Sequence, residues 1–127
     1  MQKSQPLRIV IAGSRTINNY HLLGQALHEA LLHNIITPSS TYEIVSGGAI
    51  GVDTLAKQYA SEFGYKYTEM APLYGAGNDR SAPLRRNIDM VVYGDVLVAV
   101  WDGTSRGTAH MIESMKSRGK PVYVLRI

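Results

Sequence analysis

Two glycine-rich turns hold the residues of this sequence best suited to binding a ligand. The first turn, Ser46-Gly47-Gly48-Ala49-Ile50-Gly51-Val52-Asp53, follows an apolar run and opens a helical pattern. The second, Asp102-Gly103-Thr104-Ser105-Arg106-Gly107-Thr108, follows the apolar run 95–101. The first amides of a helix have no partners within it and point outward, where they bind anions. Two such turns predict a site for a ligand that bears phosphate.

The first turn combines close backbone approach with a carboxylate. Gly47 and Gly48 would let the chain come near a phosphate without a Cβ clash, and the amides near Gly51 lie at a helix start. A tight strand-to-helix turn without any ligand is the alternative. Asp53 could hold a ribose hydroxyl, or it could cap its own helix.

The second turn offers hydroxyls and amides to one anionic group. Ser105 and Thr108 supply the hydroxyls, although Ser105 could be only the N-cap of the last helix. Arg106 could clamp a phosphate with two parallel hydrogen bonds, although exposed loop arginines commonly have no such role. His110 follows closely and could act in acid–base chemistry, but the sequence identifies no partner for it, which favours a packing role.

Two further segments add polar residues. Ser14 and Arg15 follow the first apolar run, where they could contact a base, sugar or phosphate, or form a capped turn with a solvated arginine. Arg86 and Asn87 are expected to open a helix, and a fixed arginine there opposes the helix dipole. That local cost favours a functional interpretation of Arg86. Tyr74 and Trp101 could each stack on a base, although Trp101 also fits a core position.

Apolar runs and helical periods alternate along the chain. Short β-branched runs predict strands at 7–12, 42–46, 65–70, 95–101 and 121–125, the first of them central. Helical spacing predicts helices from 19 or 20 to about 33, and at 51–63, 85–93 and 107–118. The third of these helices is recognised by Ile88, Val91 and Val92. Residues 71–83 are predicted to form a long functional or mobile loop.

This alternation predicts an α/β fold, in which parallel strands are joined by right-handed crossovers. We expect residues 1–127 to form a single domain, a three-layer α/β/α Rossmann-like sandwich with about five strands. Ligands of such sheets lie beyond the carboxyl ends of the strands, where the strand order reverses. The segments 13–15, 46–53, 71–83 and 102–108 all fall at that edge. Their convergence is the strongest argument for function that the residues provide by themselves.

Composition restricts the class of protein. There are no cysteines, which excludes disulfides, thiol nucleophiles and thiolate metal sites. The four histidines show no metal-ligand spacing, so we expect no metal, and no cofactor is indicated. Residues 1–7 do not resemble a secretion signal, and no apolar run is long enough to span a membrane, which predicts a cytoplasmic protein. The net charge of +3 suits an anionic ligand and permits nucleic-acid binding without indicating it.

The quoted segments resemble the SLOG superfamily of Rossmann-like proteins. That group includes the DprA/Smf DNA-processing proteins, the LOG phosphoribohydrolases and small stand-alone YspA-type domains. The order and spacing of the motifs are most similar to the YspA-type branch. The resemblance implies a nucleotide-binding domain that forms dimers or larger assemblies, so a homo-oligomer is a further expectation. The residues predicted to bind the ligand are Gly13, Ser14, Arg15, Ser46, Gly47, Gly48, Gly51, Asp53, Arg86, Asn87, Asp102, Ser105, Arg106, Gly107 and Thr108.

One position departs from the enzymatic branch of that superfamily. LOG enzymes carry a Gly-Gly-x-Gly-Thr-x-x-Glu signature with a catalytic Glu, and an Arg-Lys element that supplies a catalytic Arg. Here Arg86-Asn87 resembles the Arg-Lys element, but the position three beyond Thr108 is Met111. Glu113 comes two residues later, about 200° further round the helix. If the protein is an enzyme, Arg86 and Glu113 are the catalytic residues that the sequence offers.

Three functions follow, in order of preference. The first is a module that senses or sequesters a nucleotide or nucleotide-derived ligand, such as an ADP-ribose-like molecule or a phosphosugar. The second is a LOG-like hydrolase of a nucleotide N-glycosidic bond, which the missing Glu disfavours. The third is a DprA-like DNA-binding domain. The tyrosines do not form the basic and aromatic stripe used to bind single strands, which counts against the third.

Overall fold

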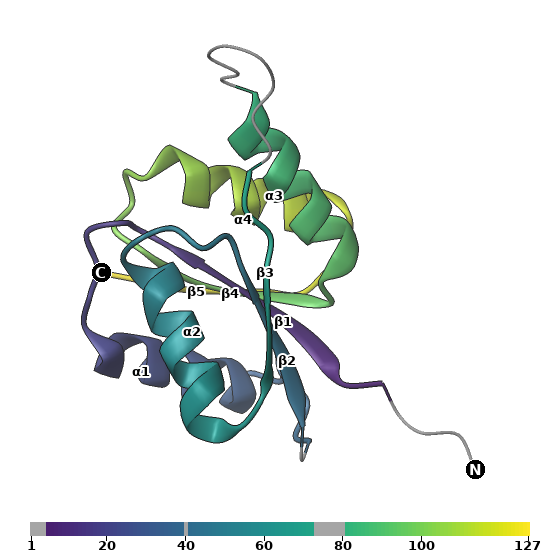
Figure 1. The fold of residues 1–127 in the computed structure, drawn as a ribbon. Helices are drawn as coiled ribbons and strands as arrows, with labels where there is room; N and C mark the ends of the chain where they lie inside the picture. The colour runs from purple at the N-terminus through teal and green to yellow at the C-terminus, as the bar shows by residue number, and fades with distance from the viewer. Residues whose placement is uncertain (1–4, 40, 73–80) are drawn as a thin grey trace.

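The computed structural model describes residues 5–39, 41–72 and 81–127 and contains five strands and four helices in strict alternation (Figure 1). In chain order they are β1 (Leu7–Gly13), α1 (Tyr20–Leu32), β2 (Tyr42–Ser46), α2 (Val52–Phe63), β3 (Lys66–Glu69), α3 (Ala82–Tyr93), β4 (Val96–Trp101), α4 (Arg106–Ser117) and β5 (Val122–Arg126). The predicted α/β fold class is confirmed.

All five strands are parallel and lie in the order β3-β2-β1-β4-β5. The strand β1 is central, as its apolar sequence predicts: Ile9 pairs with Ile44 of β2 on one side and with Val96 of β4 on the other. The chain moves outward from β1 to β3 and then returns to the other side of β1 with β4. This reversal puts the expected ligand position at the carboxyl ends of the central strands.

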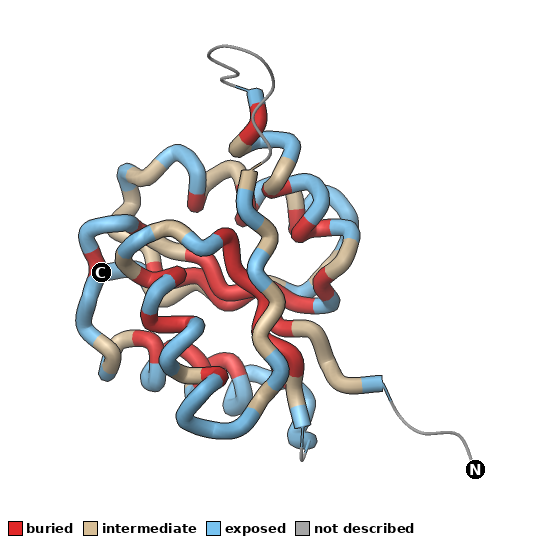
Figure 2. Tube along the Cα trace, in the orientation of Figure 1, coloured by how far each residue is buried: buried red, intermediate tan, exposed pale blue. Residues whose placement is uncertain are grey.

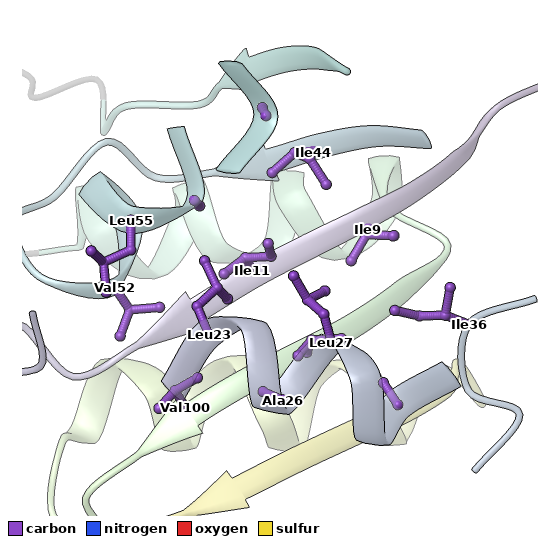
Figure 3. Close-up of a cluster of buried hydrophobic side chains, with 14 of the residues drawn as sticks. Ile9, Ile11, Leu23, Ala26, Leu27, Ile36, Ile44, Val52, Leu55 and Val100 are labelled. Carbon is purple, nitrogen blue, oxygen red and sulfur yellow. The ribbon is translucent and has the colours of Figure 1, made fainter. Parts of the chain in front are cut away.

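The helices cover both faces of the sheet, with α1 and α2 on one face and α3 and α4 on the other (Figure 1). Successive residues of a strand point to opposite faces, so Ile9 and Ile11 enter the core under α1 and α2. Val10 and Ala12 enter the core under α3 and α4. Figure 2 shows the resulting buried layer along the strands, and Figure 3 shows the α1/α2 core, where Leu23 and Leu27 pack onto the sheet.

The ends of two helices are set by local chemistry that the sequence indicates. Asn19 caps α1, because its Oδ1 accepts a hydrogen bond from the His21 amide at 3.0 Å. Gly64 ends α2 in the left-handed conformation, with φ 71°, and its amide donates to the Ala60 and Ser61 carbonyls. The predicted bounds of the other helices and strands are within one residue of the observed ones, apart from the start of α3.

The start of α3 corrects the prediction. The helix begins at Ala82, three residues before the predicted start at Arg85, and takes the last residues of the predicted 71–83 loop. Pro83 fits there because the first turn of a helix does not need its missing amide hydrogen. Arg86 and Asn87 therefore lie in the second turn of α3, where the dipole penalty on Arg86 is smaller than the sequence implies.

The buried face of α3 also differs from the expected one. Asn87, Met90 and Val91 are buried, whereas Ile88 and Val92 are 36% and 58% exposed. The spacing of apolar residues predicts a helix with one buried side. It does not show which of two adjacent rows of side chains contacts the sheet.

The carboxyl end of α3 is held by a lysine from the segment before β5. The ammonium of Lys120 donates hydrogen bonds to the carbonyls of Val91 at 2.6 Å, Val92 at 3.2 Å and Gly94 at 2.7 Å. The last carbonyls of a helix lack partners within it, and a cation stabilises them. This contact fixes α3 at the amino edge of the sheet, opposite the edge with the glycine-rich turns.

Candidate functional site

The carboxyl edge of the sheet encloses a cavity of about 500 Å³. Residues from the turns after β1, β2, β3 and β4 line it, together with the first two turns of α3 and the start of α4. The predicted convergence of these segments on one site is thus what the fold produces. Of the predicted ligand-binding residues, those that line the cavity are Gly13, Arg15, Gly47, Gly48, Asp53, Arg86, Asn87, Ser105, Gly107 and Thr108.

The other predicted residues lie behind this wall or beside it. Ser14 is buried, and its Oγ accepts a hydrogen bond from the Asp102 amide at 3.1 Å. Ser46 is also buried, with its Oγ 2.6 Å from the Tyr67 hydroxyl. Gly51, Asp102 and Arg106 are likewise not among the residues that line the cavity. Ser14 and Ser46 therefore hold the turns from behind the wall of the cavity.

Gly47 lies between a guanidinium and a carboxylate. Its carbonyl accepts a hydrogen bond from Arg86 Nη1 at 2.9 Å. A Cβ on residue 47 would come within 2.1 Å of that Nη1 and 3.2 Å of Asp53 Oδ2. Any side chain at position 47 would displace the Arg86 guanidinium from the Gly47 carbonyl. Gly51 is constrained by its backbone, because φ is 78° and a Cβ would lie 2.5 Å from the Arg15 carbonyl oxygen.

Asp53 is a buried carboxyl group at the wall of the cavity, and only 8% of it is exposed. Its Oδ2 accepts a hydrogen bond from the Ala49 amide at 3.1 Å. Burial raises the pKa of Asp53 to about 6, although the Ala49 and Gly47 amides and the Arg86 charge oppose this, and Glu69 adds a smaller upward effect. The N-cap of α2 is Gly51, and no side chain caps that helix. Asp53 therefore braces the glycine turn rather than capping α2.

Asp102 is the carboxyl group of the second turn, and its pKa is lowered where that of Asp53 is raised. Its Oδ1 accepts hydrogen bonds from the amides of Thr104 at 2.8 Å and Ser105 at 2.9 Å. These two bonds lower the pKa of Asp102 to about 2. The turn is further fixed where the Trp101 indole Nε1 donates to the Ser105 carbonyl at 3.0 Å. The carboxylate is engaged by its own turn and does not line the cavity.

The start of α4 faces the cavity with polar groups and without an acidic side chain. Ser105 is the N-cap, but it makes no side-chain capping bond, and the first turn contains no Asp or Glu. Its Oγ lies 3.2 Å from the Thr108 hydroxyl. Within the described ranges, no acceptor is found for the amides of residues 106–108. Unpaired amides and a positive helix end are what an anionic group binds.

Arg86 and Asn87 join the two glycine-rich turns. The Arg86 Nε donates to Asn87 Oδ1 at 3.0 Å, while its Nη1 holds the Gly47 carbonyl. The amide nitrogen of Asn87 donates to the Gly107 carbonyl at 3.3 Å and lies 3.1 Å from His110 Nδ1. Both side chains also line the cavity. The pair thus sets the distance between the turns from a single helix.

One side of the cavity is an apolar wall that consists of Ala12, Ala49, Ala71, Pro72, Pro83, Leu84, Met90 and Met111. Four of these residues belong to the predicted segments 46–53 and 71–83, but none of the eight was predicted to bind the ligand. Ala12, Leu84, Met90 and Met111 look like ordinary core residues in the sequence, so no signal marks them. Met111 occupies the position of the missing Glu and is buried, with 2% of it exposed.

Two other predicted residues are placed elsewhere or not at all. Glu113 lies on another side of α4 and lines a separate groove with Trp101 and Arg126. Glu113 therefore does not reach the cavity from its position in the fold. Tyr74, a candidate for stacking on a base, lies outside the described residues. No group of three or more His, Cys, Asp or Glu side chains that could hold a metal ion occurs within ranges 5–39, 41–72 and 81–127.

Sequence comparison identifies the family from the first half of the fold. A profile of the YAcAr family, described as the YspA, cpYpsA-related SLOG family, matches residues 7–73, which include the turns after β1 and β2. The chain belongs to this SLOG family. No curated protein sequence matches it significantly. None of the helices in the described parts of this SLOG protein is long and apolar enough to cross a membrane.

Solved structures share the fold of this SLOG protein. DNA processing protein A from Helicobacter pylori, described as binding single-stranded DNA, aligns with a TM-score of 0.69 and 22% identity over 96% of this chain and 66% of its own. The molybdenum cofactor binding protein from Rippkaea orientalis gives 0.67 and 19% over 98% and 79%. The molybdenum cofactor carrier protein from Chlamydomonas reinhardtii gives 0.53 and 19% over 93% and 75%. At these identities the likeness concerns the fold alone.

Proposed function

We propose that the cavity binds a nucleotide or a nucleotide-derived ligand, such as an ADP-ribose-like molecule or a phosphosugar, and that the protein senses or sequesters this ligand. The observation that carries the proposal is the contrast between the two turns that border the cavity. The turn before α4 offers two hydroxyls and amides that have no acceptor among the described residues, whereas the turn before α2 offers a buried carboxyl group. A nucleotide has this same division, with anionic oxygens at one end and hydrogen-bond donors at the other.

The phosphate is expected at the start of α4. Ser105, Gly107 and Thr108 line the cavity there, and Arg15 adds a positive charge from the turn after β1. The amides of residues 106–108 have no acceptors in the described chain. An anion at this helix end gains charge-assisted hydrogen bonds and a favourable dipole.

The sugar or the base is expected at Asp53. A phosphate beside Gly47 and Gly48 would meet the Asp53 carboxylate and the side chain of Glu69, which lies against Gly48. Like charges at such a distance repel each other. A hydroxyl or amino group would instead donate to Asp53, and that would favour its ionised form. Perturbed carboxyl groups in a cavity are typical of functional sites.

The size and walls of the cavity fit such a ligand. Its volume of about 500 Å³ lies in the range of small-molecule sites, which span roughly 300 to 1,000 Å³. Pro72, Leu84 and Met90 give one side an apolar surface. A flat heterocycle could rest on that surface while its sugar reaches Asp53.

A thermal-shift panel tests the proposal. It compares nucleosides, mononucleotides, ADP-ribose, cyclic nucleotides, molybdenum cofactor and single-stranded DNA, the last two because structural neighbours are described as binding them. We expect a phosphorylated nucleotide to raise the melting temperature, and a ligand at 100 times its Kd to add about 2.7 kcal/mol to the stability. Matched nucleosides should give a smaller shift. If no phosphorylated member stabilises the protein, the proposal is wrong.

The variant Asp53→Asn tests the ligand orientation. Asparagine has nearly the same shape and can still accept from the Ala49 amide, but it loses the charge that a hydroxyl donor favours. We expect about tenfold weaker binding of the best nucleotide, because a hydrogen bond to a charged group contributes roughly 1.5–3 kcal/mol. A deoxy analogue that lacks the donor should bind the wild type and the variant equally. Equal losses for both ligands would contradict the orientation.

Hydrolysis of an N-glycosidic bond is a second candidate, favoured by Asp53 alone. Burial brings the pKa of Asp53 to about 6, near the range of a general base, and Asp53 lines the same cavity as Arg86. Asp53 would take a proton from water as the water oxygen attacks the anomeric carbon and the N-glycosidic bond breaks, and the departing base would take a proton from solvent. Release of free base from a nucleotide, abolished in Asp53→Asn, would support this reaction. No release at high protein concentration would exclude it.

A further inference from the structure

His110 lies in the second turn of α4, outside the set of residues that line the ligand cavity. Its ring nitrogen Nδ1 is 3.1 Å from the amide nitrogen of Asn87, and in the parts of the chain that the structure describes this is the only hydrogen bond of the ring. Asn87 comes from α3, which lies beside α4 on one face of the sheet (Figure 1), and it does line the cavity. The ring is therefore attached to the ligand site through Asn87.

The two other partners of the Asn87 side chain fix the orientation of its amide group. Oδ1 accepts a hydrogen bond from Arg86 Nε at 3.0 Å, and an arginine side chain can only donate. The amide nitrogen donates to the Gly107 carbonyl at 3.3 Å, and a carbonyl can only accept. Each partner separately requires the same orientation, with the oxygen toward Arg86 and the nitrogen toward α4.

This orientation determines which nitrogen of His110 carries the proton. The Asn87 amide nitrogen has two hydrogens and does not accept hydrogen bonds. Nδ1 of His110 must therefore be the acceptor, which leaves the proton of the neutral ring on Nε2. A ring with a proton on Nδ1 would place two donors against each other and break the contact.

Asn87 thereby holds α4 at two points. Gly107 and His110 are three residues apart on α4, so both contacts lie on one side of the helix. A single contact would set the distance between α3 and α4 but would leave α4 able to rotate about its axis, and the second contact opposes that rotation. The amides of residues 106–108, which have no acceptor among the described residues, lie in the turn that Asn87 holds.

We propose that His110 is a positioning residue of the ligand site. As the Nε2–H tautomer it accepts from the Asn87 amide, and through Asn87 it keeps the first amides of α4 directed at the anionic group of the ligand. This inference rests on the proposed binding of that group at the start of α4. Several amides hold such an anion at once, so a small rotation of the helix weakens all of these hydrogen bonds together. A nucleoside, which lacks the anionic group, should be little affected.

The tautomer is tested in the ligand-free protein by long-range ¹H–¹⁵N spectra of the imidazole rings at about pH 8, where an ordinary histidine is neutral. The signals of His110 are those that disappear in His110→Asn, and the exposed His21 and His28 are internal references. We expect His110 to be the pure Nε2–H tautomer, and the references to show a mixture of both tautomers. A proton on Nδ1 of His110 overturns the proposal, whatever the ligand panel shows.

Two substitutions separate the acceptor from the bulk of the ring. His110→Asn places an oxygen close to the position of Nδ1 and has a similar helix propensity, whereas His110→Leu is of similar size without an acceptor. The probes are inorganic phosphate and the mononucleotide with the largest thermal shift. We expect His110→Leu to bind both about tenfold more weakly than the wild type, which corresponds to one hydrogen bond. His110→Asn should stay within about threefold of the wild type.

Titrations followed by the amide signals of residues 106–108 measure these affinities. A merely structural role would lower the melting temperature of His110→Leu without changing its affinity, and that result overturns the proposal. An equal loss of affinity in both variants overturns the role of the acceptor. A wild type that binds neither probe contradicts the proposed function and this inference together, whereas a wild type that binds no better than His110→Leu contradicts this inference alone.

Discussion

The two glycine-rich turns look alike in sequence but differ in charge at the cavity. Each follows a buried strand, contains two or three glycines and leads into a helix at the carboxyl edge of the sheet. The turn after β2 exposes to the cavity a carboxyl group whose pKa is raised to about 6. The turn after β4 has a carboxyl group too, but two amides of the turn bind it and lower its pKa to about 2.

The difference teaches that a strand–glycine–helix turn is not by itself a phosphate site. Whether such a turn can bind a phosphate depends on where the nearest carboxylate lies relative to the free amides. Asp53 comes two residues after the N-cap of α2 and shares the amides with any ligand. Asp102 comes three residues before the N-cap of α4 and leaves the helix amides free. Among the described residues, the amides of residues 106–108 thus have no acceptor and no acidic side chain in the first turn beside them, whereas the first turn of α2 carries the Asp53 carboxyl group.

The largest effect should be that of Asp53→Asn on stability. The folded pKa of Asp53 lies above its unfolded value, so ionisation of the group costs stability as pH rises from about 4 to about 6. Asparagine removes that cost. Relative to the wild type, the variant should gain up to about 3 kcal/mol at neutral pH and little near pH 4. Urea unfolding at both pH values measures this. Asp89→Asn, at an exposed site on α3, is the control, and a pH-independent difference would contradict the burial effect.

The second-largest effect is expected from a change in the turn after β4, and it should appear in the affinity for the ligand. Ser105→Asp retains a good N-cap residue but adds a negative charge where we place the phosphate. We expect about 100-fold weaker binding of the phosphorylated ligand, or ~2.7 kcal/mol, and little change for the nucleoside. Ser105→Asn has the same shape without the charge and should bind within a few-fold of wild type. Isothermal titration with both ligands separates the outcomes, and equal binding by the two variants would refute the phosphate assignment.

The smallest effect should come from the protonation of Asp102. Its folded pKa lies below the unfolded value, so its contribution to stability is complete above about pH 4 and is lost as pH falls toward about 2. The amides of Thr104 and Ser105 then lose their acceptor. Their hydrogen exchange, corrected for the intrinsic pH dependence, should accelerate over this interval, whereas the amide of Ala49 should not follow the same profile. Unchanged protection of Thr104 and Ser105 at low pH would show that other contacts hold the turn.

Periodicity and turn chemistry predicted the fold and the edge of the sheet where the cavity lies. Strand β1 could be identified as central because its run is apolar at successive positions and must therefore be buried on both faces. The early start of α3 could not be predicted, because Pro83 is compatible both with a loop and with a first helical turn. The side of α3 that meets the sheet depends on packing against α4, which spacing within one helix does not encode.

The cavity itself was only half predictable. Glycines and hydroxyls at strand ends carry a recognisable signal, and most of those identified line the cavity. Leu84, Met90 and Met111 carry none, since an apolar residue in a ligand cavity has the same type and spacing as one in the core. The roles of Asp53 and Asp102 depend on side-chain direction within turns of similar composition, and only the folded structure distinguishes them.

Lys120, at the amino edge of the sheet, contacts the same helix that carries Arg86 and Asn87 of the ligand site. One ammonium group serves three carbonyls at the end of α3, so acylation of that amine would remove its charge and leave one N–H donor for the three carbonyls. The same helix carries Arg86 and Asn87, which hold the two turns at its other end. Loss of these hydrogen bonds at the opposite edge of the sheet would therefore loosen the helix that holds the two turns together.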